Sequence, residues 1–125
     1  MNFKTEKKDN YTLVTILAEK IDTTIAPDLK AEFVMIASKG EKNMLLDFSK
    51  CRYIDSSGLS AILVANRLCK NAGGILVLTG LQQAVERLIV ISQLDNVLNI
   101  AYTMPKAEEM IEKHMKQTQG DGQHK

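Results

Sequence analysis

Residues 53–67, YIDSSGLSAILVANR, place an aspartate, two serines and a glycine directly before one of the most apolar segments of the chain. Asp55 and Ser56 are both residue types that cap the start of a helix. The apolar residues that follow recur with helical spacing until Gly73 and Gly74, which are typical of a helix end. The stretch therefore predicts a turn followed by a helix that runs to about Ala72, with either Asp55 or Ser56 as its cap.

Working outward from this stretch, apolar runs of strand length alternate with segments of helical periodicity. Strands are expected at 2–8, 11–18, 43–48, 75–79 and 96–100, and the other helices at 27–40, 82–91 and 105–117. The order β-β-α-β-α-β-α-β-α predicts an α/β fold, a mixed sheet with an N-terminal hairpin and a parallel later part covered by helices. We expect one domain over residues 1–117 and a disordered polar tail over 118–125.

The composition excludes several classes of protein. A net charge of +1 and an aromatic content of 5% argue against nucleic-acid binding. The N-terminus lacks the apolar segment of a secretion signal, and no apolar run is long enough to span a bilayer. Two cysteines, Cys51 and Cys69, are too few for a disulfide framework or a four-ligand zinc site. These features favour a cytoplasmic protein with two reduced, buried thiols.

The chemistry-bearing residues do not assemble into a predicted catalytic site. The histidines are His114, on the last helix, and His124, in the tail, so a Ser-His-Asp triad is not expected. Asp47 ends a predicted strand, but no acidic pair that would hold Mg²⁺ accompanies it, and a role in its own loop is the better interpretation. The glycine pair follows a helix, so its amides do not face a phosphate. We therefore predict no catalytic residue, no metal and no cofactor.

The helix after the serines has a second, partly apolar face. At 100° per residue, Leu63 falls within the polar band of the helix, Leu59 lies at its edge, and Ser56 projects to the same side. An exposed apolar stripe beside a serine suggests a protein-contact surface that a phosphate would control. The predicted face consists of Leu59, Ser60, Leu63 and Arg67. The residues alone leave open whether Ser56 or Ser57 carries the switch.

Residues 45–100, which contain the D-S-S-G-L element, closely resemble the STAS domain, and specifically the single-domain anti-sigma-factor antagonists of bacteria. Upstream, LAEKIDTTIAPDL (17–29) resembles the strand, turn and helix of the same family. The resemblance covers roughly residues 10–100. It implies a non-catalytic protein that binds an anti-sigma factor kinase and so releases a sigma factor. It further implies that the kinase uses ATP to phosphorylate Ser56, and that a metal-dependent serine phosphatase removes the phosphate.

The same resemblance implies that Asp22 and Asp55 flank the phosphorylation surface. Where family members often carry serine or threonine before the Ala-Pro pair, this chain has Ile25, which leaves Thr24 to cap the helix. The expected partner-binding surface comprises Asp22, Thr24, Asp55, Ser56, Ser57, Gly58, Leu59, Ser60, Leu63 and Arg67. The alternative is a constitutive scaffold, or a soluble subunit of a lipid ABC-transport complex, in which Ser56 is only a cap. A monomer or weak dimer is expected in either case.

Overall fold

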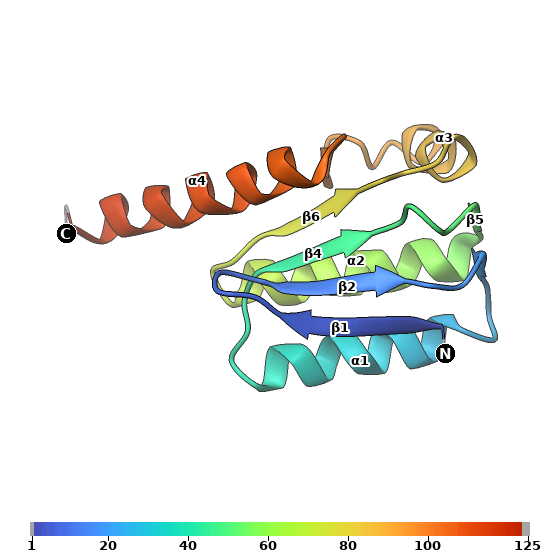
Figure 1. Ribbon diagram of the computed structural model, residues 1–125, viewed down its shortest axis with the longest axis horizontal. Coiled ribbons are helices and arrows are strands. Elements are labelled where there is room, and N and C mark those ends of the chain that lie inside the picture. Colours follow the sequence, from blue (N-terminus) through green and yellow to red (C-terminus); the bar gives the residue numbers. More distant parts are fainter. Residues whose placement is uncertain (1, 124–125) are drawn as a thin grey trace.

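The computed structural model describes residues 2–123, which form a five-stranded sheet with the strand order β1-β2-β4-β6-β7 (Figure 1). β1 and β2 are antiparallel and form the predicted hairpin, and every other neighbouring pair in this sheet is parallel. The mixed α/β sheet predicted from the sequence is therefore confirmed. Its strands are β1 (Phe3–Lys7), β2 (Thr12–Ile16), β4 (Met44–Asp47), β6 (Leu76–Thr79) and β7 (Asn99–Ala101).

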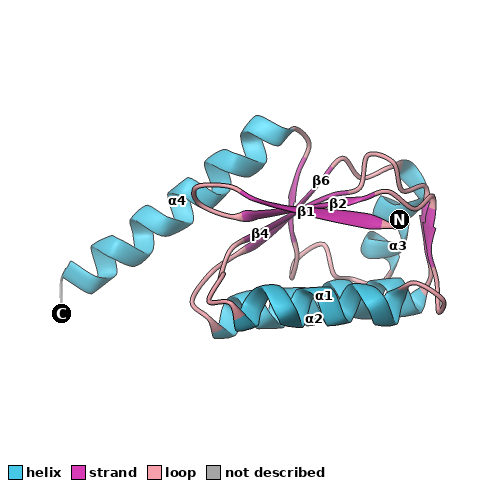
Figure 2. Ribbon diagram, turned by 60° about the horizontal axis from the view of Figure 1, so that its bottom comes forward, coloured by secondary structure: helices cyan, strands magenta, loops and turns pink. Residues whose placement is uncertain are grey.

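The helices cover both faces of the sheet. Figure 2 shows α1 and α2 side by side along one face, while α4 crosses the other and extends beyond the strands. α3 lies near the end of the sheet toward which the parallel strands point (Figure 1). The helices are α1 (Ala26–Ser38), α2 (Ser56–Asn71), α3 (Gln83–Ile91) and α4 (Met104–Gln123).

The apolar side chains of β4 show how the sheet holds these layers together. Leu46 belongs to the larger core, with Phe33 of α1 and Ile62 of α2. Leu45 points to the opposite face and belongs to a smaller core with Ile111 of α4. All five side chains are fully buried. A strand buried on both faces is a continuous apolar run without alternation, which is why this segment was recognisable in the sequence.

Two short strands were missed by the sequence analysis. β3 (Lys20–Ile21) and β5 (Tyr53–Ile54) pair in parallel and form a separate two-stranded sheet. A two-residue strand has no periodicity to detect, and only Ile21 of the four residues is fully buried. The small sheet lies immediately before α1 and α2 in the sequence, so it sets where each of these helices begins.

Several boundaries differ from those expected. The last strand was predicted at 96–100, but β7 begins at Asn99 because residues 95–97 form a turn. The prediction of a disordered tail over 118–125 is wrong for 118–123, where α4 continues to Gln123. Residues 124 and 125 lie outside the described part of the chain. Within residues 2–123, no helix combines the length and apolar character needed to cross a membrane.

Both cysteines are buried free thiols, as predicted. Burial raises the pKa of Cys51, and it raises the pKa of Cys69 to about 12. Thiols with raised pKa values are poor nucleophiles, because the thiolate is the reactive form. Both residues therefore act as small core side chains.

Candidate functional site

The first turn of α2 is organised by the carboxylate of Asp55. Asp55 is the residue that caps the helix, and its Oδ1 accepts hydrogen bonds from the backbone N–H groups of Ser57 and Gly58 at 2.9 and 3.0 Å. The hydroxyl of Ser57 donates a third hydrogen bond to the same oxygen at 2.5 Å. Of the two cap candidates, Asp55 is therefore the cap, and the interpretation of Ser56 as a cap is wrong.

The two adjacent serines differ in what their hydroxyl groups do. Ser57 is half-buried, and its hydroxyl is committed to Asp55. Ser56 is the first residue of the helix and is exposed, and its hydroxyl makes no hydrogen bond within the part of the chain described. The sequence left the choice between the serines open. The structure shows that the accessible, uncommitted hydroxyl belongs to Ser56.

Asp22 forms a turn that matches the one at Asp55. Its Oδ1 accepts from the backbone N–H of Thr24 at 2.9 Å and from the Thr24 hydroxyl at 2.5 Å. The prediction that Thr24 caps α1 is wrong, because its hydroxyl donates to Asp22 and accepts no hydrogen bond from the helix. Ile25 occupies the cap position without a side-chain hydrogen bond, and Pro27, which has no N–H, lowers the number of donors that need a cap.

The small sheet places the two aspartates next to each other. Ile21 pairs with Ile54, and the N–H of Asp55 donates to the carbonyl of Ile21 at 3.1 Å. The residue that follows each strand is an aspartate. Because the strands are parallel, both turns begin at the same end of the small sheet. A Cβ at position 58 would lie 3.1 Å from the side chains of Ile21 and Ile54 and from the carbonyl oxygen of Ile21, so a larger residue would have to displace one of them by a few tenths of an ångström. The glycine lets α2 begin directly against the two strands.

Both aspartates are held in the charged form. The hydroxyl of Ser57, followed by the N–H of Gly58, lowers the pKa of Asp55, while the nearby charge of Asp22 opposes this shift. The hydroxyl and N–H of Thr24 lower the pKa of Asp22. The exposed carboxylate of Asp55 and the half-buried carboxylate of Asp22 are therefore both charged at neutral pH.

The outer face of α2 is less apolar than predicted. Leu59 is only 8% exposed and belongs to the larger core, so its place in an exposed stripe is wrong. Leu63 is half-buried and packs against the same core. Ser60 and Arg67 are exposed, as predicted. The accessible face consists of Ser56, Ser60, the outer edge of Leu63, and Arg67, which follow one another at helical spacing.

One exposed aromatic residue near the aspartate turns was not predicted from the sequence. Tyr53 precedes the aspartate turn and is 55% exposed, with the guanidinium of Arg52 located 5.9 Å from its ring centroid. Tyr53 lines a groove of about 460 Å³ together with Glu19, Lys20 and Ile25. The signal was present in the sequence, because an aromatic residue next to a polar turn is often a contact residue.

The other candidates from the sequence have structural roles. The Oδ1 of Asp47 accepts from the N–H of Ser49 at 2.9 Å, which is the loop function that we favoured. His114 lies 3.2 Å from the carbonyl oxygen of Gly73, beyond the C-terminal end of α2, and so at the other end of that helix from Ser56. Among the described residues, no three acidic, histidine or cysteine side chains are grouped so that they would hold a metal ion.

Comparisons with known proteins agree with the resemblance seen in the sequence. The chain is 29% identical to BtrV of Bordetella bronchiseptica over 78% of its length and 84% of the relative. It is 28% identical to the anti-sigma-B factor antagonist of Bacillus subtilis over 81% of its length and 93% of the relative. The crystal structure of TM1081 from Thermotoga maritima superposes with a TM-score of 0.79 at 25% identity, covering 88% of this chain and 94% of that one. The family model for the STAS domain matches residues 2–107, and the chain therefore belongs to the STAS domain family.

Proposed function

We propose that this protein is an anti-sigma factor antagonist whose binding to its anti-sigma factor is switched by phosphorylation of Ser56. The observation that carries the proposal is the exposed, uncommitted Ser56 hydroxyl in the first turn of α2, directly after the aspartate that caps the helix. The relationship to the anti-sigma-B factor antagonist, which extends over most of both chains, supports the class of partner. The partners are then an anti-sigma factor that phosphorylates Ser56 with ATP and a metal-dependent phosphatase.

The partner surface centres on the two aspartate turns and the outer face of α2. Ser56, Ser60 and Arg67 are exposed on that face, and the half-buried Leu63 lies between them. The turn at Asp22, which includes Thr24, borders the surface from the neighbouring strand of the small sheet. Leu59 supports the surface from the core, and Gly58 allows the close approach of the helix to the strands.

A phosphate on Ser56 changes the surface without breaking the bonds that start the helix. The amides of Ser57 and Gly58 and the Ser57 hydroxyl are bound to Asp55, and none of these bonds involves the Ser56 side chain. The positive end of the helix tolerates the new charge. Two carboxylates and one phosphate then bring about four negative charges to one small area.

A partner that covers Ser56 has to remove water from this charge, and the cost of doing so weakens the complex. An unpaired charge buried at an interface costs on the order of ~2–5 kcal/mol. This corresponds to a loss of affinity of roughly 30-fold to several-thousand-fold, which is enough to turn an interaction off.

Binding measurements with the anti-sigma factors of the same organism test the proposal. Wild type and Ser56→Ala are expected to bind the cognate anti-sigma factor equally, and Ser56→Asp to bind at least roughly 30-fold more weakly. Asn71→Asp is the matched control, because it adds the same charge to an exposed position at the other end of α2, about 22 Å away along the helix. Equal binding by wild type and Ser56→Asp would contradict the switch and favour a constitutive scaffold.

Mass spectrometry locates the phosphate. After incubation with the kinase and ATP, the tryptic peptide of residues 53–67 is expected to carry one phosphoryl group on Ser56 and none on Ser57. A phosphate on Ser57 would refute the assignment, because that hydroxyl is bound to Asp55 in the structure.

A further inference from the structure

A groove of about 500 Å³ lies at the opposite end of α2 from Ser56. Asn66 and Lys70 of α2 form one side of it, and Met110 and Lys113 of α4 form the other. The groove exists because β7 pairs only with Val77–Thr79 of β6, so the edge of the sheet is open at the start of β6. Its volume is within the range of about 300–1,000 Å³ that is typical of small-molecule sites.

A buried amide faces this groove. Asn66 is only 6% exposed, and its side chain makes no hydrogen bond to any of the described residues. The amide is not enclosed: among the described residues, Thr12 Oγ1 is the only fully buried side-chain nitrogen or oxygen without a hydrogen-bond partner, so the Asn66 amide reaches solvent through the groove. Asn66 occupies a helix position where neighbouring turns carry Ile62 and Cys69 in the core, so packing alone does not require an amide there. The Asn66 amide is therefore free to form hydrogen bonds with a polar ligand in the groove.

The charges around the groove have one sign. Lys70 and Lys113 are exposed, and within the described part of the chain neither forms an ion pair. The residues that line the groove include no aspartate or glutamate. Two uncompensated ammonium groups on opposite walls favour an anionic group between them.

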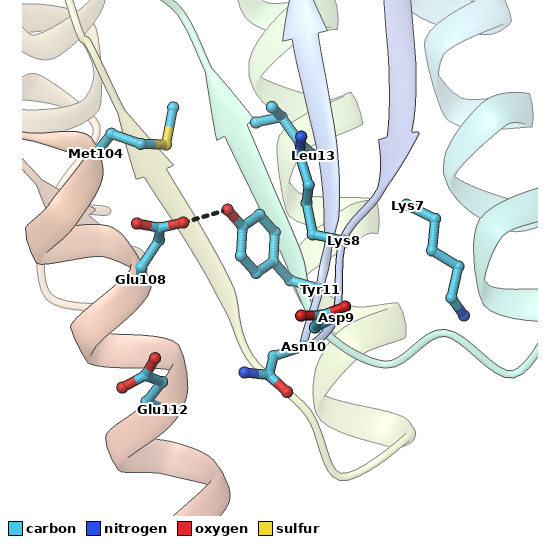
Figure 3. A pocket seen from close by; sticks show the side chains of 9 residues that line it. All are labelled: Lys7, Lys8, Asp9, Asn10, Tyr11, Leu13, Met104, Glu108 and Glu112. Carbon is cyan, nitrogen blue, oxygen red and sulfur yellow. Dashed lines mark hydrogen bonds between the residues drawn. The ribbon is translucent and has the colours of Figure 1, made fainter.

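A second groove, between the β1–β2 hairpin and α4, provides a contrast (Figure 3). Its two lysines are accompanied by Asp9, Glu108 and Glu112. The Tyr11 hydroxyl donates to Glu108 at 2.6 Å, so its buried polar group already has a partner. This groove carries both positive and negative side chains, and its Tyr11 hydroxyl is already hydrogen-bonded within the protein. It therefore offers no preferred site for an anion.

We propose that the groove between α2 and α4 binds a small organic anion, with a carboxylate, phosphate or sulfonate group on an apolar body. The anionic group lies between Lys70 and Lys113 and accepts a hydrogen bond from the Asn66 amide. The apolar body packs on Leu76 and Met110. This site is separate from the partner surface at Ser56, and it goes beyond the proposed switch without depending on it.

A pair of matched probes tests the site on the full-length, ¹⁵N-labelled protein. The sulfonate 8-anilino-1-naphthalenesulfonate carries an anion on an aromatic body, and N-phenyl-1-naphthylamine is the same body without the charge. We expect the sulfonate to shift the side-chain amide resonances of Asn66 and the backbone amides of Gly74–Leu76, with a Kd below about 1 mM. The neutral probe is expected to bind at least about tenfold more weakly.

Lysine variants link the binding to the proposed contacts. Lys70→Gln combined with Lys113→Gln is expected to weaken sulfonate binding at least about tenfold, and both positions are exposed, so folding is retained. Lys116→Gln is the control for loss of a lysine from the surface, since it removes one positive charge from α4 at an exposed position that does not line the groove. Shifts centred elsewhere, equal affinity of the two probes, or unchanged affinity in the double variant would each overturn the proposal. Sulfonate binding by Ser56→Asp should match wild type, so failure of the switch and failure of this site are distinguishable.

Discussion

The adjacent glycines that follow α2 predict losses of stability of different size and cause for the same substitution. Gly74 is buried against the segment before β4, and a Cβ built on it would lie 1.9 Å from the carbonyl oxygen of Lys42 and 2.7 Å from Oδ1 of Asn43. Gly73 has a φ of +80°, and a Cβ there would have nothing within 4 Å. Gly74→Ala is therefore a steric change, whereas Gly73→Ala affects only the backbone conformation.

The size of the steric effect follows from the bonds that surround Gly74. The backbone has to move by more than 1 Å to bring the Cβ to van der Waals distance, which is of the order that overpacked cores tolerate poorly. The bonds at risk are those from the N–H of Gly74 to Cys69, at 2.7 Å, and from the N–H of Ile75 to Asn43, at 3.0 Å. Overpacking of about 1–3 kcal/mol and two weakened hydrogen bonds of about 1 kcal/mol each predict a loss of about 3–5 kcal/mol. Gly73→Ala, which puts a Cβ into the left-handed region, should cost about 1–2 kcal/mol.

Urea denaturation followed by far-ultraviolet circular dichroism measures both losses. We expect the midpoint to fall much further in Gly74→Ala than in Gly73→Ala, with the slope of the transition unchanged in both. Equal losses in the two variants, or a larger loss in Gly73→Ala, would refute the close approach between Gly74 and the Lys42 carbonyl.

Three further predictions concern single side chains. Burial and the hydrogen bond to Glu108 raise the pKa of Tyr11 to about 12, so Tyr11→Phe should remove a tyrosinate absorbance step near that pH. Because the Tyr11 pKa is higher in the folded state, its contribution to stability is present below pH 10 and is lost as the pH rises toward 12. The pKa of Asp55 is lowered on folding from 3.8, so its contribution is present at neutral pH and is lost in acid, and the difference in stability between wild type and Asp55→Ala should shrink as the pH falls below that value. Leu59→Ala should cost about 2–4 kcal/mol in chemical denaturation and Leu63→Ala distinctly less, because Leu59 is buried and Leu63 is half-buried.

The sequence predicts the main sheet well and the small sheet not at all, for one physical reason. Residues 43–48 and 75–79 are continuous apolar runs, since these central strands are covered by helices on both faces. Lys20–Ile21 and Tyr53–Ile54 are too short to show a pattern, and their pairing depends on the tertiary arrangement around them. The missed strands nevertheless place the site, because they bring Asp22 next to Asp55.

The error at Leu59 has a similar origin. A helical wheel describes a helix with one buried side, and on such a wheel Leu59 lies at the edge of the polar band. The first turn of α2 also packs against β5, a contact that the wheel does not represent, and Leu59 is buried in the larger core. Ser60 and Arg67, which project away from both contacts, were predicted correctly.

The division of roles between two neighbouring serines is what the proposed switch at the start of this helix requires. If one hydroxyl both capped the helix and received the phosphate, phosphorylation would break the hydrogen bonds that begin the helix. The modification would then alter the fold as well as the surface. Here the cap is Asp55, assisted by Ser57, and the acceptor proposed is Ser56, one position away and exposed. Successive helix residues project about 100° apart, so one hydroxyl faces the turn while the other faces solvent. This separation allows a phosphate at Ser56 to change binding while every hydrogen bond of the Asp55 turn is kept.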